Sequence, residues 1–179
     1  DSFSFNNIAD HDLSEKAKDS IRVRAETIAS QIETFLENNP EMTIDDLQSN
    51  PVFRSITIQP IGTTGYTFLY DYENMVNLLH AKESFEGINY TKLKDEPGRE
   101  AWWNITSKTQ QGMDSEGTYL WKDPDGVFRE KYKFTKIVDA KTADGTSMAV
   151  SASAYLDEFE QTQKRASFKE LSVKLQAYK

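Results

Sequence analysis

Five side chains of this sequence each join an apolar ring to a polar tip, which is the chemistry that a small-molecule pocket needs. They are Tyr70, His80, Tyr119, Trp121 and Tyr132. Ligand pockets combine apolar walls with a few placed hydrogen-bonding groups. A cation from Arg99, Lys131 or Lys133 would pair with a carboxylate on the ligand. Packing within the core of a sheet remains the competing interpretation of each ring.

An irregular, aromatic segment from Ser84 to Met113 separates two groups of strand-like sequence. Glycines and prolines interrupt it, and a helix from Glu100 to Gln111 would carry Trp102 and Trp103. Such a segment often forms a lid or a pocket wall, although both tryptophans would also suit simple packing on a sheet. The predicted ligand-binding residues are therefore Phe68, Tyr70, His80, Trp102, Trp103, Tyr119, Trp121, Lys131 and Tyr132.

The sequence carries no recognisable catalytic set. It has no cysteine and two histidines, and it lacks a nucleophile elbow, a glycine-rich phosphate loop and a zinc-binding histidine pair. Residues Asp123 to Gly126 resemble the start of a calcium loop without its remaining ligands, so they predict a turn. We expect no enzyme, no metal and no cofactor. A small hydrolase that uses His80 with a neighbouring acid is the least favoured alternative.

The 179 residues carry a net charge of −8. This charge argues against nucleic acid as a partner, because phosphate binding needs a basic footprint. The length suffices for one domain with a hydrophobic core. No apolar run approaches the roughly 20 residues of a membrane helix, and no signal peptide is visible. The start at Asp1 leads us to expect a mature or excised fragment of a longer protein.

Apolar residues between Leu13 and Phe35 recur at steps of three and four, which predicts one long helix over residues 13–39. The preceding residues 1–12 are polar, and we expect them to be loose. Asn38-Asn39-Pro40 would end the helix. Its length fits either a surface helix or a stalk that begins outside the domain.

A β-hairpin is predicted from Gly65 to Glu83. The residues Tyr66 to Tyr70 favour strands, a polar turn follows, and a second apolar run extends from Met75 to Leu79. Neither face of the first strand is polar, so we expect the hairpin at the centre of a sheet that is covered on both sides.

Further elements complete an α+β fold. Thr43 followed by Asp46 predicts the N-cap of a short helix over residues 44–49. Additional strands are predicted near residues 118–121, 128–138 and 147–154, which gives one five-stranded antiparallel sheet with its insert over residues 56–156. A basic terminal helix is expected over residues 157–179, with an apolar stripe of Phe168, Leu171, Leu175 and Tyr178.

Several of these segments resemble, in order, the motifs of Cache sensor domains. The run from Ile58 to Asp71, IQPIGTTGYTFLYD, is similar to the entry of those domains into their sheet. His80 sits where many members carry a His-Pro pair. The segments Phe85 to Asn89, Gly117 to Trp121 and Ala152 to Leu156 resemble later motifs of the family. The similarity spans residues 13–160.

The resemblance to single-Cache members implies a PAS-like, extracytoplasmic sensor that occupies residues 1–179 and belongs to a membrane histidine kinase or chemoreceptor. The long first helix would continue from one transmembrane helix, and the terminal helix would lead through the next toward a cytoplasmic signalling module. A small-molecule ligand, with a carboxylate as one candidate, would bind under the insert. Thr67 and Leu69 would face the long helix instead. A ligand-free dimerisation or protein-interaction module on the same fold is the alternative.

Overall fold

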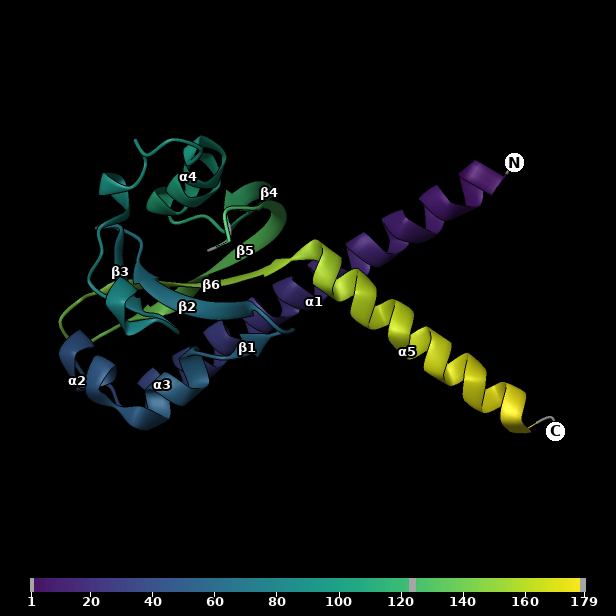
Figure 1. Ribbon diagram of the computed structural model, residues 1–179. Helices are drawn as coiled ribbons and strands as arrows, with labels where there is room; N and C mark the ends of the chain where they lie inside the picture. Colours follow the sequence, from purple (N-terminus) through teal and green to yellow (C-terminus); the bar gives the residue numbers. More distant parts are fainter. Residues whose placement is uncertain (1, 123–124, 178–179) are drawn as a thin grey trace.

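The computed structural model describes the backbone of residues 2–122 and 125–177, and side chains from residue 14 onward except 123–124, 159–160, 162–164, 167 and 177–179. Its helices are α1 (Ser2–Asn38), α2 (Ile44–Ser49), α3 (Pro51–Thr57), α4 (Glu100–Thr106) and α5 (Leu156–Ala177). Its strands are β1 (Pro60–Ile61), β2 (Gly65–Asp71), β3 (Val76–Leu79), β4 (Ser115–Lys122), β5 (Phe128–Lys141) and β6 (Ser147–Tyr155). Short 3-10 turns are η1 (Glu83–Phe85), η2 (Tyr90–Lys92) and η3 (Ser107–Gln111). Figure 1 shows the arrangement.

The strands form one antiparallel sheet, which confirms the α+β class. Their order is β1-β2-β6-β5-β4, and β3 also pairs with β2. The sheet therefore has six strands within the described residues rather than the five predicted, because β1 adds a two-residue strand beside β2. The predicted hairpin exists, but its expected central position is wrong. Strand β6 is the central strand, and β3 lies at the edge.

Helix α1 lies along one face of the sheet, against β5 and β6 (Figure 1). It is 37 residues long and begins at Ser2, so of the segment over residues 1–12 that was expected to be loose, residues 2–12 are helical, and residue 1 lies outside the described residues. Polar composition misled that prediction, since a helix that extends beyond the sheet needs no apolar face there. The apolar stripe Ala17, Ile21, Ala25, Ile28 and Ile32 is fully buried against the sheet.

Two short helices connect α1 to the sheet. The Thr43 side chain accepts a hydrogen bond from the backbone N–H of Asp46, whose carboxylate accepts one from the backbone N–H of Thr43, so the predicted N-cap is a complete capping box. Helix α3 was not predicted, and it places residues 56 and 57 outside the sheet, which begins at Pro60. The Asn50 side chain caps α3.

The insert covers the opposite face of the sheet. Helix α4 packs on β4, and backbone bonds tie the start of the insert to β3, since the N–H of Asn77 donates to the carbonyl of Ile88 and the N–H of Gly87 donates to the carbonyl of Asn77. The predicted turn after β4 includes Asp123 and Pro124, which lie outside the described residues.

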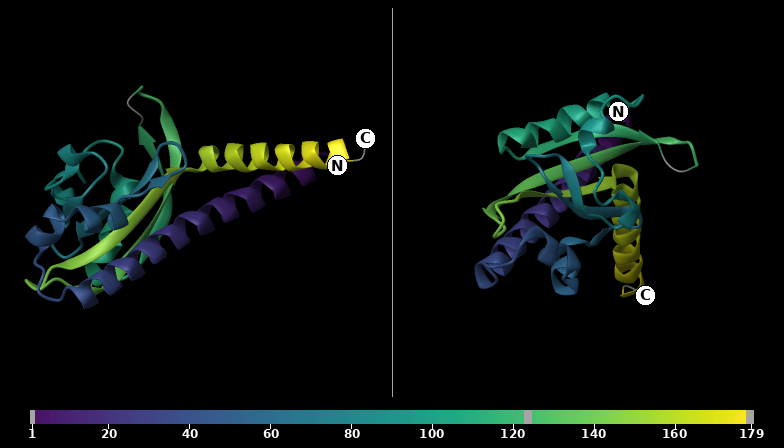
Figure 2. Two further views of the ribbon diagram at one scale, coloured as in Figure 1. Left: turned by 90° about the horizontal axis from the view of Figure 1, so that it is seen from below. Right: turned by 90° about the vertical axis from the view of Figure 1, so that its left-hand side faces the viewer.

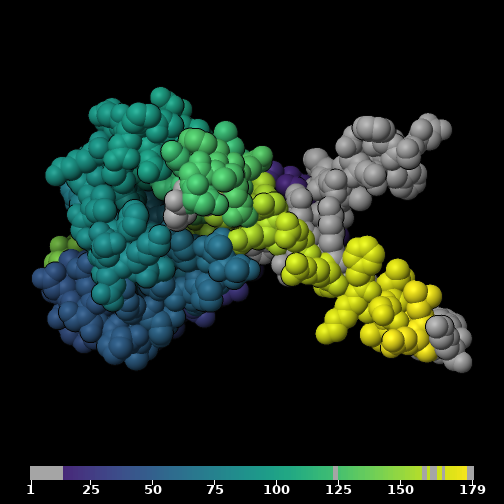
Figure 3. Space-filling model, in the orientation of Figure 1, coloured from purple at the N-terminus to yellow at the C-terminus, as the bar shows by residue number. Residues whose placement is uncertain are grey.

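Strand β6 continues into α5 without a loop, because β6 ends at Tyr155 and α5 begins at Leu156. The start of α1 and the far end of α5 extend beyond the sheet on the same side (Figure 2). Helix α5 contacts α1 and then projects from the body (Figure 3), and its side chains Phe168, Leu171 and Leu175 are exposed. The fourth member of that predicted stripe, Tyr178, lies outside the described residues. Among the described residues, no helix has the length and apolar character needed to cross a membrane.

Candidate ligand-binding site

The alternation of side chains along the strands builds the site on the insert face. Phe68 and Tyr70 of β2 point to this face, whereas Leu69 packs in the core under α1, as predicted from alternation. Asn77 of β3 pairs with Tyr70 across the hairpin. Small residues of β6, including Ser153, leave room above the sheet for the rings of its neighbours.

A cavity of about 50 Å³ lies between the sheet and the insert. Aromatic side chains make most of its wall, and the rest is one aliphatic residue and four polar ones, with His80 counted among the polar ones. The lining comprises Tyr66, Phe68, Asn77, His80, Phe85, Tyr90, Leu93, Trp102, Tyr119, Trp121, Lys131 and Ser153. A cavity needs roughly 10–15 Å³ to admit one water molecule, so this one accommodates a molecule of only a few non-hydrogen atoms. The cavity combines apolar walls with a small polar set.

His80 is fixed in the wall by its neighbours. Its ring lies 4.8 Å from the rings of both Tyr66 and Phe85, measured between centroids. The Nδ1 atom accepts a hydrogen bond of 2.9 Å from the backbone N–H of Lys82. Burial lowers the pKa of His80 to about 4, so the ring is neutral at pH 7 and carries its proton on Nε2.

The Glu86 carboxylate does not orient the His80 ring. It accepts hydrogen bonds from the backbone N–H of His80 at 3.0 Å and from Arg54 at 2.7 Å. Arg54 also donates to the carbonyl of His80 at 3.0 Å. This network holds the end of β3 in place, and it does not form the base-and-acid pair that the hydrolase alternative requires.

Lys131 brings the positive charge of the cavity. Its ammonium lies 5.1 Å from the ring centroid of Tyr66, 5.2 Å from that of Tyr155 and 5.9 Å from that of Trp121. An outer chamber of about 480 Å³ shares Tyr66, Trp121 and Lys131 with the inner cavity. Lys82 and Arg129 add further positive charge to its wall and Asp125 adds a negative one, while Arg129 also pairs with Asp157 at 2.8 Å. The two spaces together favour an anionic ligand.

A second lysine lies beneath the cavity wall. Lys133 is 0% exposed, and its Nζ donates a 2.8 Å hydrogen bond to Oγ1 of Thr106 in α4. Burial, reinforced by the charge of Lys131, lowers the pKa of Lys133 to about 7. Tyr70, also fully buried, shares a 2.8 Å hydrogen bond with the Thr109 hydroxyl in η3. These contacts join the insert to the sheet.

The structure brings most of the predicted site residues together. Those that line the inner cavity are Phe68, His80, Trp102, Tyr119, Trp121 and Lys131. Tyr70 lies in the aromatic core behind the lining, and Trp103 packs beside Trp102 with its ring centroid 6.2 Å away. Neither lines the cavity.

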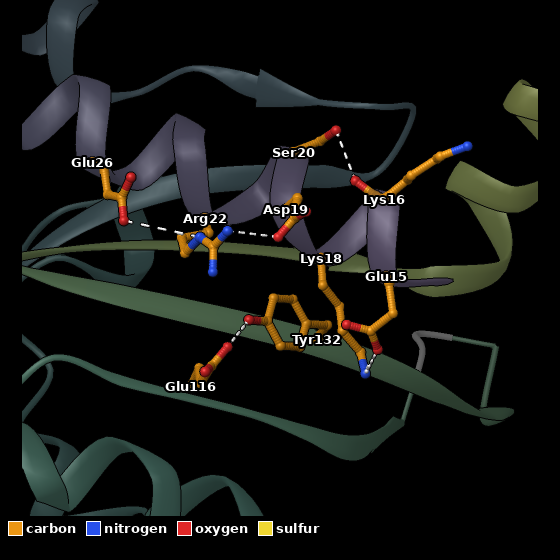
Figure 4. Close-up of polar contacts among 9 residues, drawn as sticks. All are labelled: Glu15, Lys16, Lys18, Asp19, Ser20, Arg22, Glu26, Glu116 and Tyr132. Atoms are coloured by element: carbon orange, nitrogen blue, oxygen red, sulfur yellow. Dashed lines mark hydrogen bonds and ion pairs between the residues drawn. The ribbon is translucent and has the colours of Figure 1, made fainter. Parts of the chain in front are cut away.

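The placement of Tyr132 in the pocket is wrong. It lies on the α1 face, in the same core as Phe134 and Ile21. Figure 4 shows its hydroxyl directed at Glu116, to which it donates a hydrogen bond, with α1 alongside. Lys18 of α1 lies 5.9 Å from the centroid of its ring. The physical reason is alternation: neighbours 131 and 132 of one strand point to opposite faces, so only Lys131 reaches the cavity.

Sequence reasoning missed half of the lining residues, namely Tyr66, Asn77, Phe85, Tyr90, Leu93 and Ser153. Asn77 left a readable signal, because it is the only polar residue in the apolar run from Met75 to Leu79. Its side chain is buried, and its Nδ2 donates a 2.6 Å hydrogen bond to the Tyr90 hydroxyl. Within the described part of the chain, no cluster of histidine and acidic side chains could hold a metal ion.

Comparison with known proteins places this geometry in a family. The dCache_2 model, described as a Cache domain, matches residues 3–178. No curated protein matches the chain. Two similar solved structures are each 14% identical to it. One is a periplasmic sensor domain of a chemotaxis protein, with a TM-score of 0.51, and it covers 79% of this chain and 94% of its own.

The other is a Cache chemosensory domain whose structure was presented as a basis for carboxylic acid recognition. It has a TM-score of 0.49 and covers 79% of this chain and 92% of its own. Of the two, only the chemotaxis sensor domain, with its TM-score of 0.51, supports the fold, and at 14% identity it supports the fold alone. The family model covers nearly the whole sequence, and this chain therefore belongs to the Cache domain family.

Proposed function

We propose that residues 1–179 form one extracytoplasmic Cache unit that binds a small molecule for a transmembrane receptor, and that a histidine kinase is its output module. In this arrangement α1 continues from one transmembrane helix and α5 leads into the next. The two helices extend beyond the sheet on the same side, which suits attachment to one membrane (Figure 2). Ligand binding would bias the receptor only as far as it differs in affinity for two conformations.

One observation carries the proposal: the aromatic cavity with Lys131 in its wall lies on the face that α1 leaves uncovered. The insert forms its roof, and the inner and outer spaces meet at Tyr66, Trp121 and Lys131. The ammonium of Lys131 lies over the rings of Tyr66, Trp121 and Tyr155 and keeps its charge, and a carboxylate forms charge-assisted hydrogen bonds with such a cation. A carboxylate of small size is the ligand that this wall fits.

A thermal-shift screen of small carboxylates, amines and amino acids tests the binding function. A ligand present at 100 times its Kd stabilises the folded chain by about 2.7 kcal/mol. The variant Lys131→Met keeps the stem of the side chain and removes its charge, so carboxylates should shift the wild type and lose most of that effect in the variant. Equal shifts in both proteins would place the ligand elsewhere, and no shift with any compound would remove the binding function.

The kinase assignment has a separate test in the full-length receptor. In membranes supplied with ATP, a histidine kinase acquires an acid-labile phosphate whose rate of formation changes with the ligand. A chemoreceptor acquires no such phosphate and instead changes the activity of a separate kinase that is added to the membranes. The second result would support the sensor function and identify the output module as a chemoreceptor rather than a histidine kinase.

A ligand-free interaction module is the second candidate. The small size of the inner cavity favours it, since about 50 Å³ is nearly closed by the rings of the protein itself. In that case two copies would associate. Sedimentation at rising protein concentration measures this directly. A dimer whose thermal stability is changed by no compound in the screen would support the interaction module over the sensor.

A further inference from the structure

The inner cavity contains one buried polar atom whose hydrogen-bonding capacity is unused. Asn77 is 1% exposed, and its Nδ2 donates to the Tyr90 hydroxyl, yet its Oδ1 has no hydrogen-bond partner among the described residues. A buried acceptor without a partner costs about 1–3 kcal/mol, so native proteins rarely leave one unless something else fills the position. The position of Asn77 in the cavity wall makes a ligand the natural partner.

The backbone leaves the Asn77 side chain little freedom to find another partner. Its N–H donates to the carbonyl of Ile88 at 2.9 Å, and its carbonyl accepts from the N–H of Gly87 at 2.8 Å. Its strand position lies opposite Tyr70, whose ring packs 5.3 Å from that of Tyr90. The amide is therefore held between the sheet and the insert, with one end bound and the other end free.

The remaining polar groups of the lining are mainly donors. Lys131 is a cation, and neutral His80 has one N–H while its Nδ1 is already occupied by the N–H of Lys82. The lining includes no acidic side chain among the described residues. The cavity thus offers a cation and donors for an anion, hydroxyls of Ser153, Tyr66 and Tyr119 that can donate or accept, and the unused amide oxygen of Asn77, which can only accept.

We propose that the ligand is a short carboxylate with an O–H or N–H donor on the carbon next to the carboxylate, and that Asn77 selects for this donor. The two groups must lie close together, because about 50 Å³ holds only a few non-hydrogen atoms. This inference rests on the proposed function as a binding domain and adds the chemical class of the ligand. The Asn77 amide acts as a specificity-determining group, and Lys131 attracts the anion.

Matched pairs of compounds test this selection by isothermal titration of the 179-residue chain. The pairs are glycolate with acetate and lactate with propionate, which differ only by the hydroxyl. The wild type should bind the hydroxylated member about 10-fold or more tightly, because the deoxy compound leaves Oδ1 of Asn77 unpaired. Equal affinities within a pair would overturn the inference and leave the carboxylate sensor intact. If none of the four compounds binds, the inference and the carboxylate ligand both fail.

A double variant provides the matched control. Asn77→Leu with Tyr90→Phe replaces both members of the hydrogen-bonded pair by apolar groups of similar shape, which is compatible with folding. Circular dichroism confirms the fold before titration. The variant should bind glycolate and acetate with affinities within about 2-fold of each other. A retained preference for glycolate would exclude Asn77 as the selecting group, and the wild-type comparison decides the ligand class even if this variant does not fold.

Discussion

On the face of the sheet that α1 covers, β6 presents Met148, Val150, Ala152 and Ala154. On the face that the insert covers, the same strand presents Ala149, Ser151 and Ser153. The first set continues an aliphatic core with the apolar stripe of α1. The second set is small and partly polar, so tyrosines and lysines from the flanking strands β2 and β5 and tryptophans from β4 and α4 lie over it and a cavity remains. One strand thus supports a packed face and a binding face by alternation alone.

The largest effect is expected on the packed face. Leu69→Ala removes a fully buried side chain under α1 and should reduce the free energy of unfolding by about 2–5 kcal/mol, measured by urea denaturation. Ligand affinity should stay close to that of the wild type. Trp121→Leu on the binding face is the matched control, with the opposite outcome of weaker binding and little loss of stability. If Leu69→Ala weakens ligand binding as strongly as folding, the two faces are not separate in function.

Lys133 should make the binding face sensitive to pH. Its folded pKa of about 7 lies below that of an exposed lysine, so between pH 7 and pH 10 the unfolded chain binds more protons than the folded chain. Stability contributed by this group therefore rises with pH, by roughly 3 kcal/mol between pH 7 and pH 9.5. Urea denaturation across that range measures the slope. The variant Lys133→Met has no titrating amine, so its unfolding free energy should lack this dependence on pH. An identical slope in the variant and the wild type would contradict the prediction.

A pair of tyrosines sharpens the comparison at smaller scale. Tyr132→Phe removes the hydrogen bond to Glu116 on the α1 face and should cost about 1 kcal/mol of unfolding free energy without changing ligand affinity. Tyr119→Phe removes a hydroxyl from the cavity wall instead, and its effect should fall on binding. Thermal denaturation with and without ligand measures the effect of each substitution on stability and on ligand binding. The reverse pattern would mean that the faces are assigned the wrong way round.

The smallest effect is expected on α5, outside both faces. Phe168 is 72% exposed, so Phe168→Ser should change the free energy of unfolding of the monomer by less than about 0.5 kcal/mol. Urea denaturation at low protein concentration provides the value. Lys169→Ser is a polar control one residue away. A larger loss for Phe168→Ser that grows with protein concentration would show that this face is covered by another copy.

The elements were predictable where local chemistry dictates structure. The capping box of Thr43 and Asp46 and the long alternating strand after Gly126 were both legible in the sequence. Helix α3 was not, because Ile56 and Thr57 are β-branched residues that favour strands, while the Asn50 cap and Pro51 at the first turn decide in favour of a helix. The order of strands in the sheet depends on contacts distant in sequence, which composition and periodicity do not encode.

The site was predictable by residue type but not fully by direction. Lys131 and Tyr132 were both placed in the pocket, although adjacent residues of one strand cannot point to the same face. The contribution of Phe85 and Leu93 depends on how the insert folds back onto β3, which no local pattern specifies. Asn77 was overlooked because an isolated amide within an apolar run looks like an imperfection of the strand until its surroundings are known.

The direct passage from β6 into α5 has a mechanical consequence. A helix of 22 residues is about 33 Å long, so it acts as a lever whose pivot is the junction of Tyr155 and Leu156. A tilt of about 5° at the pivot would displace the far end of a straight helix of this length by about 3 Å. Ser153 lies in the cavity wall, two residues before Tyr155. A strain at the cavity wall that is too small to alter the fold would therefore become a displacement of atomic size at the far end of α5.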